Sequence, residues 1–398
     1  MLMNAEIRST AVPESHVPLL PISLFFLTWI GLPWFAIGFW LHPLVPGGWS
    51  FFFTVFLVVV IPLKTLVNGF TGKAYPDAST RLRVLRPFWY CMLTFPIIAA
   101  TMLAFAAIGS LFEASSLWAR GSLALSIPGL IAIGIVGWNH SRKLAVKPIS
   151  VPVPNLPETF EGLKIAQISD LHVGPHTSKP FLEKVNTTVL DQKPDLIVIT
   201  GDQVDDFAQD IEHFNAAFEG LSAPHGVYAV IGNHDIYANW IPVKAGLERE
   251  GIDVLVNESK AIEKDGHRLW VAGTGDPAAS RKNPLQAPAA PDISLTLEGI
   301  PEDEPVLALA HNPALWPELK ERGVALTLSG HTHYGQFAIP ALNWSLASPF
   351  LDYAMGLYKE GASSLYIHPG TGFWGIPFRF GTPAEVALIT LTNSVSSQ

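Results

Sequence analysis

The sequence contains a single cysteine, Cys91, so the chain cannot form a disulfide bond within itself. This absence is compatible with a reducing compartment. Charged residues are also scarce, at 15% of 398, and a formal net charge of -9 provides no basic surface for a nucleic-acid backbone. Hydrophobic residues reach 49% and the mean hydropathy is +0.30, which indicates that part of the chain lies in lipid.

The lack of charge is concentrated in the first part of the chain. Between Glu14 and Lys64 there is no Asp, Glu, Lys or Arg. This stretch is too long for one membrane-spanning helix, which needs about 20 apolar residues, and it divides at the turn-rich residues 42–48. Further charge-free runs cover residues 87–112 and 121–141. We therefore predict a membrane domain over residues 1–146 with four transmembrane helices, at about 19–42, 49–67, 87–112 and 121–141.

Two other interpretations of these runs are weaker. Buried helices of a globular core are rarely so long and so free of charge. A cleaved signal peptide would explain only the first run, and the segment before that run has one basic residue, Arg8.

Basic residues predict the orientation of the membrane domain. They gather in the loop between the second and third predicted helices and after the fourth helix: Lys64, Lys73, Arg81, Arg83, Arg86, Arg142, Lys143 and Lys147. By the positive-inside rule, these segments and both chain ends are cytoplasmic, and so is the domain that follows.

The segment after the membrane domain is rich in proline. Residues 147–158 predict an extended polyproline II tether, at about 3.1 Å per residue. Such a tether would hold the next domain, residues 159–393, near the membrane, and residues 394–398 would form a tail.

Five β-rich runs in residues 159–393 each end at a polar motif. They are Leu163–Ser169, Asp195–Thr200, Gly226–Ile231, Pro305–Ala310 and Ala325–Ser329. Helical stretches at 179–190 and 210–219 separate the early strands, as crossover connections do. The ends of such strands meet at one edge of a sheet, so we expect one site there. Seven candidate metal ligands follow the strands directly: Asp170, His172, Asp202, Asn233, His311, His331 and His333.

The ligand types restrict the chemistry. Each motif alone is weak evidence, but seven oxygen and imidazole donors after five strands are not expected by chance. Carboxylate, amide and imidazole donors without a thiolate suit Mn, our first expectation, or Fe or Zn. Two divalent cations and two aspartates leave a formal charge of about +2, which attracts phosphate and lowers the pKa of a bound water. The sequence therefore predicts hydrolysis of phosphate esters.

The order of the motifs resembles the calcineurin-like metallophosphoesterase superfamily. The resemblance covers about residues 160–393 and rests on Asp170-x-His172, Gly201-Asp202-x-x-Asp205, Gly232-Asn233-His234-Asp235, His311 and Gly330-His331-x-His333. The segments 330–336, 356–358 and 381–385 are similar to a membrane-associated bacterial branch, which implies a bacterial inner membrane. Members of that branch usually have glycine where this chain has Tyr334, a change expected to affect the pocket wall and not the metals.

The resemblance implies an α/β (α+β) sandwich of two β-sheets flanked by helices. It also divides the seven ligands into two sets that share Asp202 as a bridge. The first metal would be held by Asp170, His172 and His333, and the second by Asn233, His311 and His331.

Three further residues receive roles from the same resemblance. His234 is similar to the histidine that approaches the leaving oxygen, where a general acid contributes about 10²–10⁴-fold to the rate. Asp235 is expected to orient His234. Asp205 is expected to orient a metal ligand, although a turn carboxylate explains its position equally well.

The membrane domain suggests a lipid-linked substrate, such as a phospholipid, an isoprenoid diphosphate or a nucleotide-diphospho-sugar lipid. Residues 276–292 and Trp344–Tyr358 are candidate walls of its binding site, and His368 is a candidate lining residue. Three alternatives stay open: a phosphodiesterase for soluble phosphoesters or nucleotides, a catalytically silent membrane sensor or scaffold, and a transporter with an attached hydrolase. Nucleic acid is not an expected partner, and the sequence leaves the oligomeric state open.

Overall fold

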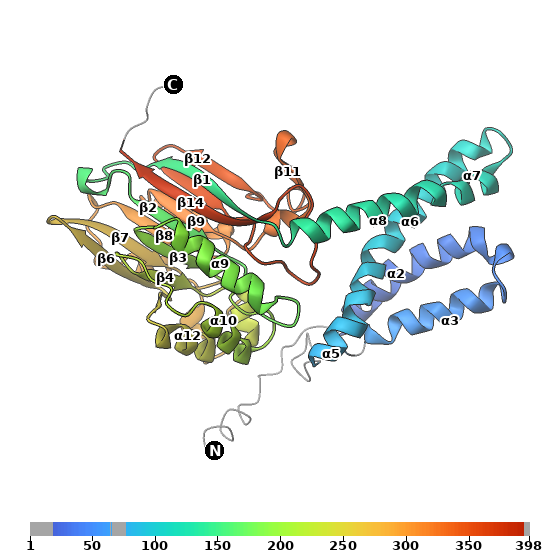
Figure 1. Cartoon of the computed structure of the whole chain (residues 1–398), viewed down its shortest axis with the longest axis horizontal. Coiled ribbons are helices and arrows are strands. Elements are labelled where there is room, and N and C mark those ends of the chain that lie inside the picture. Colours follow the sequence, from blue (N-terminus) through green and yellow to red (C-terminus); the bar gives the residue numbers. More distant parts are fainter. Residues whose placement is uncertain (1–18, 64, 66–76, 394–398) are drawn as a thin grey trace, which may run out of the picture. The chain divides into compact units, whose positions relative to one another are not determined.

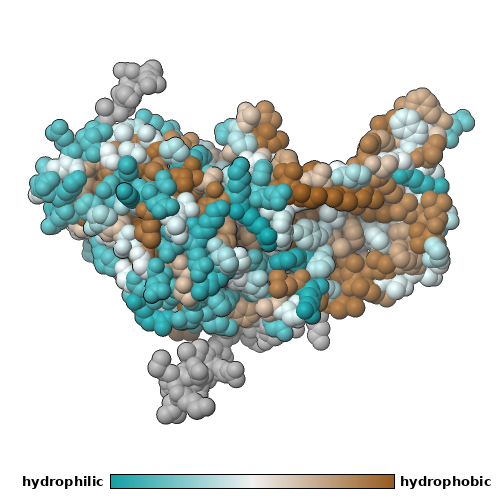
Figure 2. All heavy atoms as spheres, viewed as in Figure 1, coloured by the Kyte–Doolittle hydropathy of each residue, from teal (hydrophilic) through white to brown (hydrophobic). Residues whose placement is uncertain are grey.

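The computed structural model describes residues 19–63, 65 and 77–393 (Figure 1). The chain divides into two units, Met1–Ile135 (unit 1) and Val136–Gln398 (unit 2). The division falls earlier than the predicted boundary at residue 146, because the last residues of a long helix belong to unit 2. Figure 2 shows hydrophobic residues over the helices of unit 1 and mainly hydrophilic residues over unit 2.

Apolar helices build unit 1. Their bounds are α2 Leu19–Leu41, α3 Trp49–Val60, α5 Ala78–Thr80, α6 Arg86–Ser110, α7 Ser115–Gly121 and α8 Leu123–His140, with a π-helical turn at Arg81–Leu85 between α5 and α6. Three continuous helical stretches are long and apolar enough to cross a membrane: Ser23–Leu44, Ala78–Ser110 and Ser115–His140. They correspond to the first, third and fourth predicted spans.

The second predicted span is different. Helix α3 has 12 residues and is about 18 Å long at 1.5 Å per residue, which is less than the ~30 Å of a bilayer core. The end of the predicted 49–67 segment lies outside the described residues. The count of four transmembrane helices therefore stays a prediction.

The helices of unit 1 contact one another through aromatic and small side chains. Trp34 Nε1 donates a hydrogen bond to the carbonyl of Phe52 over 2.8 Å, and Met102 is fully buried. The outward surface is apolar instead: Leu32 is 72% exposed and Leu111 is 79% exposed. Such a surface is stable in lipid tails and unfavourable in water.

Two six-stranded sheets form the body of unit 2. The first has the strand order β1-β14-β2-β3-β4-β5, with bounds Leu144–Pro152, Ala384–Thr392, Lys164–Ile168, Leu196–Thr200, Val227–Val230 and Asp253–Val254. The second has the order β12-β13-β9-β8-β7-β6, with bounds Gly356–Glu360, Ser363–Ile367, Leu326–Ser329, Val306–Leu309, His267–Gly273 and Glu258–Lys264. A small two-stranded sheet pairs β10 (Ala338–Ile339) with β11 (Trp344–Ser345).

Alternation of side chains across the strands gives unit 2 its layers. Inward side chains of both sheets, among them Val198 and Leu309, form one buried cluster between the sheets. The outer face of the first sheet packs against α9 (Lys179–Asp191), α10 (Ile211–Ala217) and α12 (Trp240–Arg249). The outer face of the second sheet packs against α13 (Ile293–Thr296) and α14 (Trp316–Glu321). The prediction of two sheets flanked by helices is confirmed.

The predicted proline-rich tether, residues 147–158, is wrong over its first half. Residues 144–152 form strand β1, which pairs with β14 in parallel from Leu144↔Ala384 to Pro152↔Thr392. Its two prolines are tolerated because β1 is an edge strand, where a missing N–H removes no necessary ladder bond. Polyproline II and β backbones have similar dihedral angles, so proline content alone did not distinguish a free tether from an edge strand.

Candidate metal centre

Polar motifs follow the strand ends as the sequence predicted. The five predicted strands are β2, β3, β4, β8 and β9, with β2, β3 and β4 parallel in one sheet and β8 and β9 parallel in the other. Each is followed within three residues by a predicted ligand. Because parallel strands end at the same edge, five separate motifs come together in one place.

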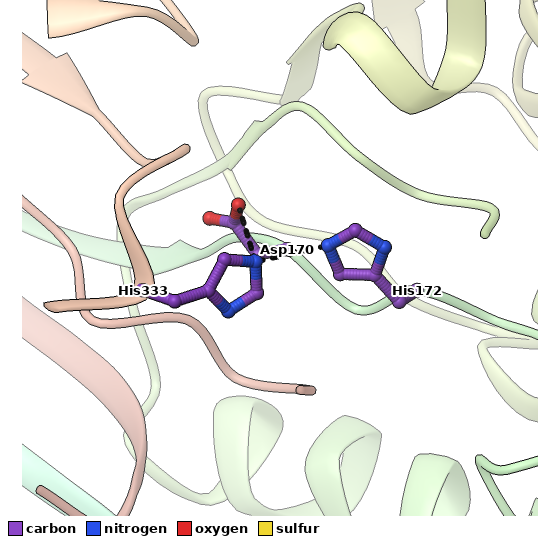
Figure 3. A group of neighbouring side chains, drawn as sticks. All are labelled: Asp170, His172 and His333. Carbon is purple, nitrogen blue, oxygen red and sulfur yellow. Dashed lines mark hydrogen bonds and ion pairs between the residues drawn. The ribbon is translucent and has the colours of Figure 1, made fainter. Parts of the chain in front are cut away.

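The first group joins the loops after β2 and β9 (Figure 3). The Nε2 atoms of His172 and His333 lie 3.0 Å apart, and His333 Nε2 is 3.3 Å from Asp170 Oδ1. All three side chains are buried. The backbone N–H of His331 donates to both Asp170 oxygens over 2.9 and 3.2 Å, which fixes the carboxylate. These three residues form a group able to hold a metal ion.

A second group surrounds the amide of Asn233. Its Oδ1 lies 2.8 Å from His331 Nδ1 and 3.2 Å from His311 Nε2. The other ring nitrogen of His311 donates to the Thr200 carbonyl over 2.7 Å, so Nε2 is the nitrogen directed at the group. An imidazole held from behind in this way has a fixed tautomer, as metal-binding histidines do.

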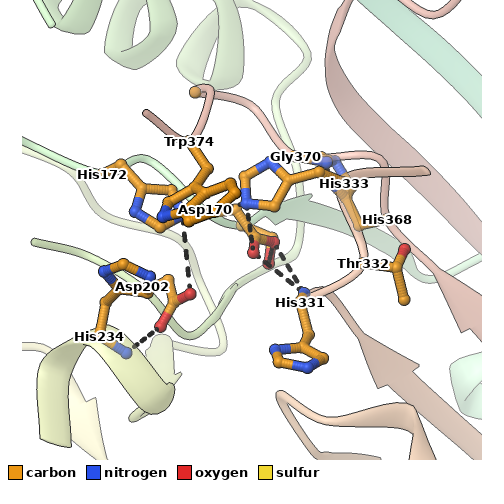
Figure 4. Close-up of polar contacts among 12 residues, drawn as sticks. Asp170, His172, Asp202, His234, His331, Thr332, His333, His368, Gly370 and Trp374 are labelled. Atoms are coloured by element: carbon orange, nitrogen blue, oxygen red, sulfur yellow. Dashed lines mark hydrogen bonds and ion pairs between the residues drawn. The ribbon is translucent and has the colours of Figure 1, made fainter. Parts of the chain in front are cut away.

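Asp202 lies between the two groups. Its Oδ2 is 3.6 Å from His172 Nε2 and 3.3 Å from His311 Nε2. Its Oδ1 accepts from the backbone N–H of His234 over 2.8 Å (Figure 4). The side chains of the seven candidate ligands therefore lie together around Asp202.

The backbone of these loops is strained. Five of the seven candidate ligands have φ between 45° and 70°, the left-handed region: Asp170, His172, Asp202, His331 and His333. A non-glycine residue there costs about 1–3 kcal/mol and persists only where the surrounding structure imposes it. Such clustering is typical of a functional site.

Two motif glycines allow the loops to approach. A Cβ atom at Gly330 would lie 2.2 Å from Asp170 Oδ2, and one at Gly232 would lie 2.2 Å from Asp202 Oδ1. Both contacts are far shorter than a van der Waals contact. Glycine at these two positions is thus required for the carboxylates to occupy their places.

The electrostatics suit cations. Burial raises the pKa of Asp170. Burial opposes ionisation of Asp202 as well, but the neighbouring imidazoles of His311 and His234 hold its pKa well below the usual range. Burial and His311 lower the pKa of His331 to about 4, and burial and His172 place that of His333 well below its ordinary value. The lowered pKa values keep His331 and His333 neutral, as metal binding requires. Burial lowers the pKa of His311, but the carboxylates of Asp202 and Asp170 more than offset this and raise it well above its ordinary value, so His311 would release a proton on binding a cation. Carboxylate, amide and imidazole donors of this kind fit a pair of divalent cations.

His234 is oriented by Asp205, and the predicted role of Asp235 is wrong. His234 Nδ1 donates to the Asp205 carbonyl over 2.6 Å and lies 3.8 Å from its carboxylate. That carboxylate is also 3.3 Å from His172 Nδ1. Asp235 instead accepts from the N–H groups of Gly232 and Val204 over 2.8 and 3.1 Å. Adjacent residues at a helix start point in different directions, so neighbourhood in sequence did not imply contact.

Arg379 is a residue that the motifs did not reveal. It is fully buried and donates to the carbonyls of Pro369, over 2.7 Å, and Gly372, over 2.8 Å. A Cβ at Gly370 would lie 2.5 Å from its Nη2 and 3.0 Å from His333 Nδ1, so the guanidinium lies directly behind the first group. Its signal in the sequence was a lone charge within an apolar stretch, residues 373–381.

Two other buried polar groups lie in the candidate walls. Asp276 begins the 276–292 segment, is 1% exposed, and accepts from Ala278 N–H over 2.8 Å. Burial raises its pKa to about 6. His368 is fully buried and accepts from Gly370 N–H over 2.9 Å, so it supports a loop behind the site.

Tyr334, the departure from the resembling branch, is in the protein core. It is 4% exposed and has φ of 54°, and its hydroxyl donates to the Ile367 carbonyl over 2.7 Å while accepting from Gly356 N–H over 2.8 Å. The Tyr334 side chain therefore packs in a buried cluster with Trp316 and Ile367. The two hydrogen bonds of the Tyr334 hydroxyl fix this side chain, and a glycine at this position could not form them.

Comparison with known proteins agrees with this geometry. A family model described as calcineurin-like phosphoesterase matches residues 163–335. The chain is 31% identical to a Bos taurus transmembrane protein with metallophosphoesterase domain over 357 residues, 86% of this chain and 77% of that protein. This alignment is longer than unit 2, so the similarity extends into unit 1.

Two more matches are shorter or more distant. A metallophosphoesterase of Helicobacter pylori is 35% identical over 58% of this chain. The match covers 60% of the Helicobacter pylori protein, which is less than two thirds of that protein's length. A solved structure of a dimetal phosphatase from Danio rerio is 12% identical, with a TM-score of 0.35, over 59% of this chain and all of that one. Members of the matched family are metal-dependent hydrolases of phosphoesters. On the identity and coverage shared with the Bos taurus protein, this chain belongs to the calcineurin-like phosphoesterase family.

Proposed function

We propose that this chain is a membrane-anchored phosphoesterase with two divalent cations, which hydrolyses a phosphate ester or diphosphate of a lipid-linked substrate. The observation that carries the proposal is the position of Asp202 Oδ2, between His172 Nε2 at 3.6 Å and His311 Nε2 at 3.3 Å. One carboxylate oxygen facing two separate donor groups suits a shared ligand of a metal pair.

Each donor group would hold one cation, and Mn²⁺ is the first expectation. Asp170, His172 and His333 form the first set, Asn233, His311 and His331 form the second, and Asp202 belongs to both. Two cations bound there would bind the phosphate oxygens, neutralise their charge and lower the pKa of the attacking water.

The protein's own acid in this proposal is His234. Its Nδ1 proton is committed to the Asp205 carbonyl, so Nε2 is the nitrogen left to protonate a leaving oxygen. Burial lowers the pKa of His234, but the carboxylates of Asp202 and Asp205 more than offset this and raise it above its ordinary value. A raised pKa keeps the imidazole protonated, as a general acid requires.

Apolar surface beside His234 favours an amphiphilic substrate. The rings of Trp374 and Tyr237 lie 6.4 and 5.7 Å from the His234 ring, centroid to centroid. Trp374 is 46% exposed and Tyr237 is 54% exposed. Aromatic rings at the edge of a polar site suit the apolar part of a lipid whose phosphate reaches the donors.

The proposed location is a bacterial inner membrane with unit 2 in the cytoplasm. The support is the basic residues that follow α8, Arg142 and Lys143, together with those before α6. By the positive-inside rule these residues stay on the cytoplasmic side.

A substrate panel tests the proposal. The full chain, purified in detergent and loaded with Mn²⁺, is incubated with phospholipids, isoprenoid diphosphates, nucleotide-diphospho-sugar lipids and soluble nucleotides, and the hydrolysis products of each are identified by mass spectrometry. We expect turnover of at least one lipid class. Turnover confined to soluble esters would eliminate the lipid substrate and retain the phosphoesterase, whereas inactivity of the loaded protein on the whole panel would favour a sensor or scaffold.

A further inference from the structure

We propose that the exposed apolar side chains of the charge-free segment 334–351 of unit 2 lie in the surface of the lipid bilayer, beside the metal centre. The segment, named here the apolar loop, runs from Tyr334 to Leu351 and contains no Asp, Glu, Lys, Arg or His. This membrane contact is additional to the transmembrane helices and does not depend on which phosphoester is hydrolysed.

The apolar loop exposes large side chains that a water-facing loop would bury or replace. Phe350 is 80% exposed, Leu342 72% and Leu346 49%, and Ile339 and Leu351 are 38% exposed each. Figure 2 shows hydrophobic atoms on the projection that carries the β11 label in Figure 1. A contiguous exposed apolar surface marks a contact with a membrane or a protein.

Contacts within unit 2 connect the apolar loop to the end of a candidate transmembrane helix. The last residues of α8 belong to unit 2, and the Phe378 ring packs on Gly137, where a Cβ would lie 2.2 Å from Phe378 Cδ2. Arg379 N–H donates to the Gly137 carbonyl over 3.0 Å. The next residue, Phe380, stacks on Phe337 with ring centroids 4.8 Å apart, and Ala338 N–H donates to its carbonyl over 2.9 Å.

The base of the apolar loop also contacts the rim of the metal centre. Gln336 donates from Nε2 to the Trp374 carbonyl over 3.1 Å and accepts from Trp374 N–H over 2.8 Å. The Trp374 ring lies near His234, as described above. A bilayer that met the apolar loop would therefore lie close to the route by which an amphiphile reaches the site.

The bilayer is the occupant that these contacts favour. The apolar loop is bonded to Phe380, and the two residues before Phe380 contact Gly137 near the end of α8. The helical stretch that ends with α8 is apolar enough to cross a membrane. At the same end, the guanidinium of Arg142 lies 3.9 Å from the Trp138 ring centroid, an aromatic-basic pair of the kind found at lipid headgroups. The apolar loop thus continues a membrane boundary, and apolar side chains in such a place insert about 5–10 Å below the headgroups.

Fluorescence quenching by lipids tests the proposal in the full chain. In a Cys91→Ser background, which has no other cysteine, Phe350→Cys or Leu342→Cys is labelled with an environment-sensitive fluorophore. The protein is reconstituted in vesicles of phosphatidylcholine and phosphatidylglycerol with or without nitroxide-labelled acyl chains. We expect a blue-shifted emission at both positions and at least about twofold stronger quenching by the nitroxide lipid than at a water-facing site.

Leu295→Cys provides the matched control. Leu295 is a leucine that is 50% exposed on α13, which packs at the β6 end of the second sheet, whereas the apolar loop connects β9 to β12 at the other end. Each labelled variant must have the same melting temperature as the Cys91→Ser parent. Equal quenching at the three positions, or water-like emission from both loop positions, would overturn the proposal and leave a protein partner as the occupant.

Discussion

Exposed leucines in unit 1 and buried carboxylates in unit 2 invert the usual pattern of a water-soluble protein in two different ways. In unit 1, Leu32 and Leu111 face outwards at 72% and 79% exposure. In unit 2, Asp170 and Asp235 are fully buried among neighbouring loops. The first pattern suits lipid surroundings. In the second, backbone N–H groups satisfy carboxylate oxygens, and the cations of the proposed function would satisfy others.

The comparison also shows that one residue type carries different information in the two units. An exposed leucine is ordinary in unit 1, whereas Leu342 and Phe350 are the most exposed of the large apolar side chains in the described part of unit 2. A buried aspartate is likewise costly unless something compensates it, so in unit 2 it indicates a site.

The largest effect is expected from removing the shared carboxylate. Asp202→Asn removes a negative charge that faces both donor groups, and we expect phosphoester turnover to fall by about 10³-fold or more. The melting temperature in detergent should change little, because the amide preserves the shape. Asp265→Asn, an exposed turn residue between β6 and β7, is the control and should keep full activity. If Asp202→Asn keeps its turnover, Asp202 is not an essential ligand shared by the two cations.

His234→Gln tests the general acid. We expect kcat to fall by at least about 10²-fold while KM changes little, since the group acts on the leaving oxygen. The loss should be larger for alkyl esters than for nitrophenyl esters, because a good leaving group needs less protonation. His213→Gln, an exposed histidine of α10, is the matched control. A loss that is equal for both kinds of ester would instead indicate a structural role.

Replacing an exposed leucine with arginine tests whether the surfaces of the two units have different surroundings. Leu32→Arg places a cation in the middle of α2, and the expected cost is about 3 kcal/mol if this face meets lipid. Leu295→Arg, at a half-exposed leucine of unit 2, should cost under about 0.5 kcal/mol. The measurement is the yield and melting temperature of the full chain purified in one detergent. Similar tolerance of both changes would contradict a lipid-facing α2.

The smallest predicted effect is a pH dependence due to Asp276. Its folded pKa of about 6 exceeds the ordinary value near 3.9, so the unfolded chain releases this proton at lower pH. The contribution of Asp276 to stability therefore falls as pH rises from about 4 to 6, by up to about 2–3 kcal/mol. Asp276→Asn keeps the acceptor for Ala278 and should lose this dependence in metal-free protein. The measurement is the melting temperature of the parent and of Asp276→Asn at several pH values. If the melting temperatures of the two proteins change with pH in the same way, the contribution of Asp276 is disproved.

Much of the site was predictable because its residues follow strand ends. Runs such as Leu196–Ile199 are apolar throughout, as buried parallel strands are, and each is followed by Asp, Asn or His within a few residues. Because parallel strands end at the same edge of a sheet, the residues that follow them are brought together there, and this can be predicted from the sequence. The two donor sets came from the family resemblance, since no local pattern states which histidine meets which carboxylate.

Orientation of side chains was less predictable. Asp205 and Asp235 both lie beside motif residues, but only the folded chain turns Asp205 towards His234 and Asp235 towards two backbone N–H groups. Arg379 was missed because its position behind His333 depends on a loop about 45 residues downstream, a contact that local patterns do not encode.

The sequence by itself determined the apolar segments, five strands of unit 2 and the seven candidate donors that follow them, because hydrophobic runs and residue chemistry are local properties. Only the tertiary structure decided that residues 147–152 complete a sheet, that Tyr334 is in the core, and that the apolar loop is bonded to Phe380, next to the residues that contact Gly137 of α8. These outcomes depend on partners far away in the chain, such as β14 and Phe380, and pairing over such distances is decided by the energy of the whole fold.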